Sequence, residues 1–180
     1  MSSDSVLVVT GGAGFIGANF VRLVLAERPD WTVRVLDRLT YAGDRTRLAD
    51  TPVDFTEGDI ADTATVSNVL DGARWLVNFA AESHVDRSLV DAEPFMHTNV
   101  LGTHRLLEAA RVAGLERIVH VSTDEVYGES RGGAFSETDP LAPRNPYSAS
   151  KAGGDLMALA LHASFDLPVC VTRAVNTIGP

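Results

Sequence analysis

The sequence predicts an α/β fold, a doubly wound parallel sheet of six or more strands with helices on both faces. Short apolar runs alternate with longer segments of helical periodicity, and this alternation is typical of parallel strands joined by right-handed crossovers. A glycine-rich turn also follows the first apolar run, as in folds that bind phosphates at the edge of a parallel sheet. The expected elements are strands 5–10, 32–37, 53–57, 75–79, 117–122 and 169–173, and helices 15–26, 62–70, 94–113 and 147–163.

The first strand leads into the turn TGGAGFIG at 10–17. We expect Gly11 to take backbone torsions closed to other residues, Gly14 to let a pyrophosphate approach, and Gly17 to let the following helix pack against the strand. The N-terminus of that helix offers N–H groups and a partial positive charge to phosphates. These features predict a Rossmann-type dinucleotide site that includes Gly11, Gly14, Phe15, Ile16 and Gly17. The apolar face of the helix is expected to carry Ile16, Phe20, Leu23 and Val24.

The second strand ends at Asp37, 20 residues after Gly17. A carboxylate at this offset accepts hydrogen bonds from the adenosine ribose hydroxyls and repels a 2′-phosphate, so NAD(H) is predicted over NADP(H). The neighbouring Arg38 weighs against this preference for NAD(H), because an arginine can contact a phosphate. After the third strand, Asp59 and Ile60 are expected to hold the adenine. The alternative for Asp59 is that it caps the next helix.

The fourth strand is followed by small residues and then by a polar cluster, AAESHVDRS at 80–88. Ala80 and Ala81 would let a cofactor lie against the backbone. Ser83 and His84 are expected to contact the substrate, because open α/β sheets bind ligands at this edge. No metal is expected, since only one histidine is local and no second ligand has helical spacing.

The chemistry is predicted for two segments, STDEVYG (122–128) and YSASKA (147–152). Tyr147 and Lys151 are four residues apart at a helix start, so they share a face, and a lysine one turn away, with the positive charge of the nicotinamide nearby, can lower the pKa of a phenol. Thr123 is expected to hydrogen-bond the same substrate hydroxyl. The adjacent Asp124 and Glu125 suit an elimination, which needs one acid and one base. The alternative is that these carboxylates form a solvated loop pair.

Taken together, these segments resemble the extended short-chain dehydrogenase/reductase superfamily and, within it, the dTDP-glucose 4,6-dehydratases. The resemblance covers essentially the whole chain. STDEVYG is its most discriminating motif, because epimerases of the superfamily usually lack adjacent acidic residues there. The matching segments, in the order of the family, are TGGAGFIG (10–17), DRLTYAG (37–43), GDI (58–60), AAESHVDRS (80–88), TNVLGT (98–103), STDEVYG (122–128), YSASKA (147–152) and TR..N..GP (172–180).

The resemblance implies a cofactor, NAD, a nucleotide-diphosphate sugar as substrate, and a role for each site residue. Tyr147, supported by Lys151, would take the proton of the sugar O4 while hydride passes from C4 to NAD+. Glu125 would remove the C5 proton, and Asp124 would protonate the departing C6 hydroxyl. The hydride would then return to C6, which gives a 4-keto-6-deoxy sugar. Asn176 would contact the substrate.

Two departures from the family pattern leave the exact function open. Thr177 and Ile178 replace the expected asparagine and tyrosine, which is compatible with a dehydratase that acts on a UDP-2-acetamido sugar. We expect 1–180 to be the NAD-binding domain alone, because family members continue into a substrate-binding region after the sixth strand. Two further functions fit the same segments: a related NAD-dependent 4-epimerase, for which Asp124 and Glu125 would be dispensable, and an NAD-binding module without turnover.

Composition limits the partners and the location. A net charge of −9 argues against non-specific binding to nucleic acid and against attraction to an anionic membrane. Cys170 is the only cysteine, which excludes an internal disulfide, and its apolar run predicts burial. The N-terminus has no basic segment before a short apolar stretch, so the cytoplasm is expected. Helices 94–113 and 147–163 are apolar over a wide arc, which predicts a homodimer through them.

Overall fold

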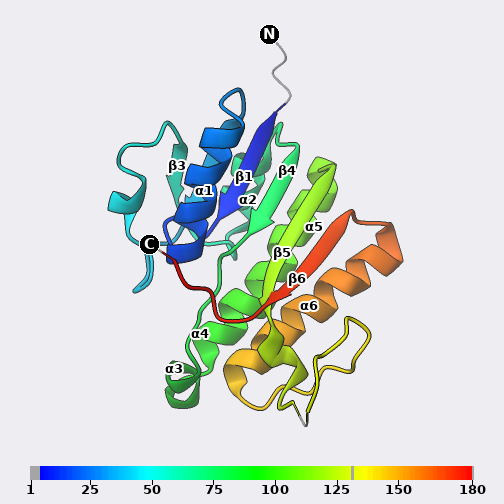
Figure 1. Cartoon of the computed structure of the whole chain (residues 1–180). Coiled ribbons are helices and arrows are strands. Elements are labelled where there is room, and N and C mark those ends of the chain that lie inside the picture. The colour runs from blue at the N-terminus through cyan, green and yellow to red at the C-terminus, as the bar shows by residue number, and fades with distance from the viewer. Residues whose placement is uncertain (1–4, 131, 180) are drawn as a thin grey trace.

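The computed structural model describes residues 5–130 and 132–179. Within them the strands form one parallel sheet of six strands in the order β3-β2-β1-β4-β5-β6 (Figure 1). This confirms the predicted doubly wound sheet, in which the order of the strands reverses between β1 and β4. The strands are β1 (Val6–Thr10), β2 (Thr32–Asp37), β3 (Asp54–Glu57), β4 (Trp75–Asn78), β5 (Arg117–Thr123) and β6 (Val169–Ala174).

The four predicted helices are present, and the third contains an unpredicted change of geometry. The predicted helix 94–113 is a continuous run of three segments, with a π-helical turn in its middle. Short helices after β4 and β5 and one 3-10 turn after β2 escaped the sequence analysis, because they are too brief to show a period. The helical segments are α1 (Phe15–Glu27), η1 (Arg45–Leu48), α2 (Thr63–Leu70), α3 (Val85–Val90), α4 (Glu93–Phe95), η2 (Met96–Gly102), α5 (Thr103–Ala113), η3 (Asp124–Tyr127) and α6 (Pro146–Phe165).

Helices cover both faces of the sheet, as predicted, but they do so unequally (Figure 1). Val8 and Val9 are both fully buried, on opposite faces of β1. One face packs against α1, and the other packs against α2, α5 and α6. No helix of the described residues is long and apolar enough to cross a membrane.

The buried face of α1 differs from the predicted one. Ile16 and Leu23 are 41% and 59% exposed. The predicted Val24 is buried and Phe20 packs against the core, and the side of the helix that meets the sheet is completed by Ala18 and Val21, which were not predicted.

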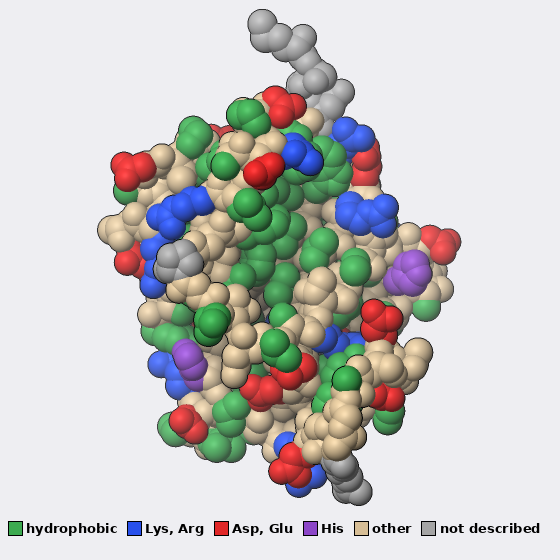
Figure 2. All heavy atoms as spheres, viewed as in Figure 1, with side chains coloured by type: hydrophobic (Ala, Val, Ile, Leu, Met, Phe, Trp, Pro, Cys, Tyr) green, Lys and Arg blue, Asp and Glu red, His purple; other side chains and the backbone are tan. Residues whose placement is uncertain are grey.

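The prediction that Cys170 is buried is wrong, because its side is not covered. Cys170 is exposed. It lies on the edge strand β6, whose alternate residues Val169 and Val171 pack against the core on the α6 side. Figure 2 shows apolar side chains gathered on the opposite face, between α1 and β6. An apolar run in an edge strand therefore does not imply burial on both sides here.

Candidate active site

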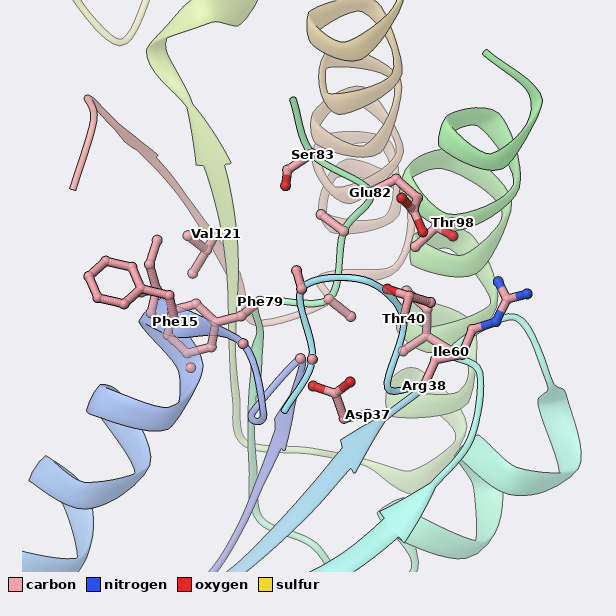
Figure 3. A pocket seen from close by; sticks show the side chains of 18 of the residues that line it. Phe15, Asp37, Arg38, Thr40, Ile60, Phe79, Glu82, Ser83, Thr98 and Val121 are labelled. Atoms are coloured by element: carbon pink, nitrogen blue, oxygen red, sulfur yellow. The ribbon is translucent and has the colours of Figure 1, made fainter. Parts of the chain in front are cut away.

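A pocket of about 750 Å³ opens at the carboxyl edge of the sheet (Figure 3). Its wall is formed by the ends of the strands, the loops that follow them, and the start of α6. Thr123 and Asp124 lie beside this wall rather than in it. The predicted site residues that line the pocket are Gly11, Gly14, Phe15, Ile16, Gly17, Asp37, Asp59, Ile60, Ala80, Ala81, Ser83, His84, Glu125, Tyr147, Lys151 and Asn176.

The glycine-rich turn forms one end of the pocket, and close backbone packing fixes its shape. Gly11 has φ +68°, and a Cβ there would lie 2.6 Å from the backbone nitrogen of Ala80. A Cβ on Gly17 would collide with the carbonyl oxygen of Gly11 and lie 2.8 Å from Cα of Gly12. The helix start thus lies close to the turn at Gly11 and Gly12, whereas the prediction for Gly17 was close packing against the strand. The first N–H groups of α1 have no acceptor within the helix, and Phe15, Ile16 and Gly17 all line the pocket.

Asp37 lies at the floor of this end, where β2 stops (Figure 3). Its two carboxylate oxygens accept hydrogen bonds from the backbone N–H groups of Ala13 and Leu39, each at 2.8 Å. These bonds hold a mostly buried carboxylate in one orientation against the glycine turn. The carboxylate thus lines the pocket beside the glycine turn.

Asp59 does not cap the following helix, so that alternative is wrong. The N-cap of α2 is Asp62, whose side chain accepts from the N–H groups of Ala64 and Thr65. Asp59 instead accepts from the N–H of Ala61 and forms an ion pair with Arg38 at 3.1 Å. Arg38 is therefore engaged by a carboxylate of the pocket wall, which makes it less available to a phosphate.

Tyr41, which sequence reasoning missed, joins two loops at the rim of the pocket. Its hydroxyl accepts from the N–H of Ser83 at 3.2 Å and lies 2.8 Å from Oγ of the same residue. The guanidinium of Arg87 lies over its ring, 3.8 Å from the centroid. Ser83 is thus held beside the pocket, and the neighbouring His84 takes φ +75°, which is uncommon for a residue other than glycine.

The start of α6 forms the opposite end of the pocket. The helix begins with a capping box between Asn145 and Ser148, which fixes the first turn that carries Tyr147. The ammonium of Lys151 donates to the carbonyl oxygen of Val121 at 2.7 Å. Burial lowers the pKa of Lys151 to about 8, although the nearby carboxylate of Asp155 opposes this shift.

The predicted lowering of the Tyr147 pKa is not what the structure shows. Burial raises the pKa of the Tyr147 phenol, and the carboxylate of Glu125 raises it further, while a hydrogen bond with Thr123 lowers it. Lys151 donates to the β5 backbone instead of to the phenol. The protein scaffold alone therefore favours the protonated phenol.

The adjacent carboxylates form a structured turn at the end of β5. Thr123 caps η3 by accepting from the N–H of Glu125 at 3.2 Å, and its hydroxyl lies 3.3 Å from Oδ1 of Asp124. Asn145 donates to Oε2 of Glu125 at 3.4 Å. Both carboxylates are half-buried, which argues against the alternative of a solvated loop pair. Only Glu125 reaches the pocket wall, so the two acids have different surroundings.

Several lining residues had no role assigned from the sequence, although some of their motifs had been identified. Thr40 and Tyr41 lie in DRLTYAG, and Thr98 lies in TNVLGT, where the π-helical turn brings it to the pocket (Figure 3). For Glu82, the sequence pattern indicated no role. Its backbone N–H and C=O are both bonded by the side chain of Asn99, at 2.9 and 3.0 Å.

Comparisons with known proteins agree with this geometry. The chain is 55% identical over 178 residues to the low-salt glycan biosynthesis protein Agl12 of Haloferax volcanii, covering 97% of the chain and 57% of that protein. It is 52% identical over 180 residues to the dTDP-glucose 4,6-dehydratase of Streptomyces griseus, with 97% and 55% covered. The chain thus spans about half the length of the relatives that it matches.

A solved structure matches the fold closely. This is the dTDP-glucose 4,6-dehydratase DesIV of Streptomyces venezuelae, solved with NAD and dTDP bound. The TM-score is 0.93 at 52% identity, and the match covers 97% of the chain and 57% of DesIV. The family model described as GDP-mannose 4,6 dehydratase matches residues 8–180. With nearly all of its length in that match and in the same fold, the chain belongs to the GDP-mannose 4,6 dehydratase family.

Proposed function

We propose that the pocket binds NAD. The bare glycine turn, which a Cβ at Gly11 or Gly17 would fill, fits a pyrophosphate, and the carboxylate of Asp37 fits the adenosine ribose. Asp59 and Ile60 would hold the adenine, and Ala80 and Ala81 would border the rest of the cofactor. The ion pair between Arg38 and Asp59 supports NAD over NADP. DesIV, a relative with the same fold, was solved with NAD bound.

We propose that the protein eliminates water from a nucleotide-activated hexose to give a 4-keto-6-deoxy sugar. One observation carries this proposal: a phenol, a lysine and the carboxylate of Glu125 line a dinucleotide-type pocket, and a second carboxylate, that of Asp124, lies beside its wall. When bound, NAD+ supplies the acceptor that oxidises C4 and later returns the reducing equivalent to C6.

Each catalytic group has a part that its place in the structure supports. Tyr147 would take the O4 proton, aided by Lys151 and by the positive charge of the cofactor, which together oppose the raised pKa of the phenol. Glu125 lines the pocket and would remove the C5 proton. Asp124 would protonate the departing C6 hydroxyl. Thr123, Ser83, His84 and Asn176 would orient the sugar.

The first experiment follows the sugar nucleotide. The full-length protein is incubated with NAD+ and either dTDP-glucose or UDP-N-acetylglucosamine, and the products are analysed by mass spectrometry. Loss of one water without accumulation of NADH is the expected result, and the preferred substrate identifies the sugar. In Glu125→Gln, kcat should fall by roughly 10²- to 10⁴-fold. Glu129→Gln, an exposed glutamate in the next loop, is the matched control and should keep full activity.

The same experiment separates a dehydratase from an epimerase and from a cofactor-binding module. An unchanged mass with inversion at C4, insensitive to Glu125→Gln, would indicate a 4-epimerase and contradict the elimination. NAD binding without any change in the sugar would indicate a module that binds the cofactor alone.

We further propose that the protein forms a homodimer through helices 94–113 and 147–163. Leu107 and Ala110 of the first helix are fully buried against the sheet. Met96 and Leu101 in η2 are 52% and 38% exposed, and Leu156 of α6 is 57% exposed, so apolar area remains on the outer side. Sedimentation should give a dimer, and a single monomer species would contradict this proposal.

The cytoplasmic location and the assignment of 1–180 as the cofactor-binding domain stay predictions.

A further inference from the structure

A chain of polar side chains, all buried except the partly buried Arg173, runs beneath the catalytic end of the pocket, across the central sheet. Its members come from separate parts of the sequence. Its members, in spatial order, are Thr10 of β1, Asn78 of β4, His120 of β5, Asp155 of α6, Arg173 of β6 and Tyr127 of η3.

In the first half of this chain of polar side chains, the hydrogen bonds are all donated in one direction. The hydroxyl of Thr10 donates to Oδ1 of Asn78 at 2.6 Å, which turns the amide NH2 group toward His120. That amide nitrogen lies 3.0 Å from Nδ1 of His120, which must then accept. The hydrogen of the imidazole is therefore on Nε2, which lies 3.6 Å from Oδ1 of Asp155, beyond hydrogen-bond distance, and neither of these two buried atoms has a hydrogen-bond partner among the described residues. Burial and the charge of Lys151 lower the pKa of His120 well below 6.5, which keeps the ring neutral.

The second half of the chain converges on the same carboxylate. Nε of Arg173 donates to Oδ2 of Asp155 at 2.9 Å, and the Asp155 side chain is fully buried. Nη1 of Arg173 donates to the hydroxyl of Tyr127 at 2.6 Å, and the guanidinium lies over the ring of that tyrosine. Tyr127 is the last residue of η3, the turn that begins with the two site carboxylates. Asp155 is thus connected to this turn through one arginine.

Asp155 also lies on the catalytic face of its own helix. Tyr147, Lys151 and Asp155 follow one another at intervals of four residues along α6, so they share one side. Asp155 is the carboxylate that opposes the desolvation of the Lys151 ammonium, which is only 4% exposed. The residues of η2 and α5 that lie against this part of α6, at Gly154, are the uncharged Asn99 and Thr103.

We propose that Asp155 is a positioning residue of the active site, whose carboxylate couples the α6 face bearing Tyr147 and Lys151 to the turn bearing Asp124 and Glu125. The expected effect of Asp155 on turnover rests on the proposed dehydratase function, but its electrostatic effect on Lys151 depends only on the fold. The charged and titratable groups that face Asp155 are Lys151 from α6, His120 from β5, Arg173 from β6 and, through that arginine, Tyr127 from η3.

The test uses a property that needs no substrate. Lys151 is the only lysine among the 180 residues, so lysine labelled with ¹³C and ¹⁵N reports on it by NMR, with Lys151→Arg to identify its signal in the full-length protein. In Asp155→Asn the side chain keeps its shape and loses its charge. The pKa of Lys151 should then fall by at least about half a unit, because the opposing carboxylate is gone.

Controls separate this electrostatic role from a loss of folding. Asp155→Asn leaves the Arg173 guanidinium without its partner, so Asp155→Asn/Arg173→Gln is measured alongside it and should show a fall in the same direction but smaller, because the positive charge of Arg173 is also gone. Asp155→Glu should restore the titration of Lys151 in part. Glu116→Gln removes a carboxylate from an exposed ion pair with Arg74 and should leave the titration unchanged. An unchanged Lys151 titration in both neutralised variants would overturn the proposal.

Turnover tests the other arm of the proposal. In Asp155→Asn, kcat should fall at least about tenfold, with the KM changed less, and the alkaline limb of the pH profile should move to lower pH. Tyr127→Phe, which removes the acceptor of Arg173, should lower kcat without changing the Lys151 titration. A loss of kcat with an unmoved pH profile would reduce Asp155 to a structural role. If the wild type eliminates no water from any sugar nucleotide while the NMR shift is still seen, the proposed function fails and the coupling stands.

Discussion

The two ends of the pocket differ in whether backbone or side chains form them. At the nucleotide end the backbone determines the shape of the pocket: Gly11 and Gly17 make contacts that leave no room for a side chain, and Asp37 is fixed by two backbone N–H groups. At the catalytic end, side chains make the site. Tyr147 and Lys151 project from one helix toward the end of β5, over a buried chain of polar groups.

This difference determines what each end responds to. A site made from backbone geometry tolerates changes of pH but not an added methyl group. A site made from buried titratable groups tolerates small changes of shape but responds to charge, because burial and neighbouring charges move the pKa values of Lys151, His120 and Tyr147. Substitutions at the two ends should therefore fail in different ways.

The largest effect is expected from removing one oxygen atom at the catalytic end. In Tyr147→Phe, kcat should fall by roughly 10²- to 10⁴-fold, because the group that takes the O4 proton is lost. NAD affinity should change little, since the ring itself, which lies edge-on 6.3 Å from Phe95, is retained. Turnover assays and a fluorescence titration with NAD measure the two quantities. Equal losses of turnover and of affinity would show that the two ends are not separable.

A smaller and opposite pattern is expected when the nucleotide end is changed. In Gly17→Ala the new Cβ would collide with the backbone of Gly11 and Gly12, so the turn or the helix must shift. NAD affinity should fall about tenfold or more, and the melting temperature should fall as well, because such strain costs about 1–3 kcal/mol. Leu23→Ala shortens a 59% exposed side chain on the same helix and is the matched control. An affinity within twofold of the wild type would contradict the backbone account.

The same contrast explains what the sequence predicted well. The sheet, the main helices and the glycine turn follow from local pattern, and most of the predicted site residues line one pocket. Local sequence pattern gave wrong predictions where the structure around a residue depends on packing between distant elements. Asp59 was the cap considered from the sequence, and only the course of the loop shows that Asp62 is the cap of α2. Cys170 is exposed because the cover over an edge strand depends on other elements.

The buried polar chain was the least predictable feature. His120 and Asp155 lie 35 residues apart, and each is a single polar residue within an apolar or small-residue segment. The one available signal was the spacing of Tyr147, Lys151 and Asp155 along a helix, which identifies a shared face but not what the face meets. The direction of the Lys151 pKa likewise needed its burial and its bond to β5, which a helical pattern does not contain.

The smallest expected effect is a pH dependence of stability that belongs to the catalytic end alone. The pKa of Lys151 is about 8 in the folded protein and 10.5 for an ordinary exposed lysine, so between these values the unfolded chain binds more protons than the native one. The free energy of unfolding should therefore rise with pH from 8 to 9.5, by about 1 kcal/mol per pH unit. Above pH 10 the raised pKa of Tyr147 opposes this trend, because the native state then holds the extra proton.

Urea titrations of the wild type and Lys151→Met at several pH values should show the rise only in the wild type. Asp37→Asn, which changes the nucleotide end and leaves Lys151 in place, should keep the rise, and a rise that survives in Lys151→Met would assign the titration to another group.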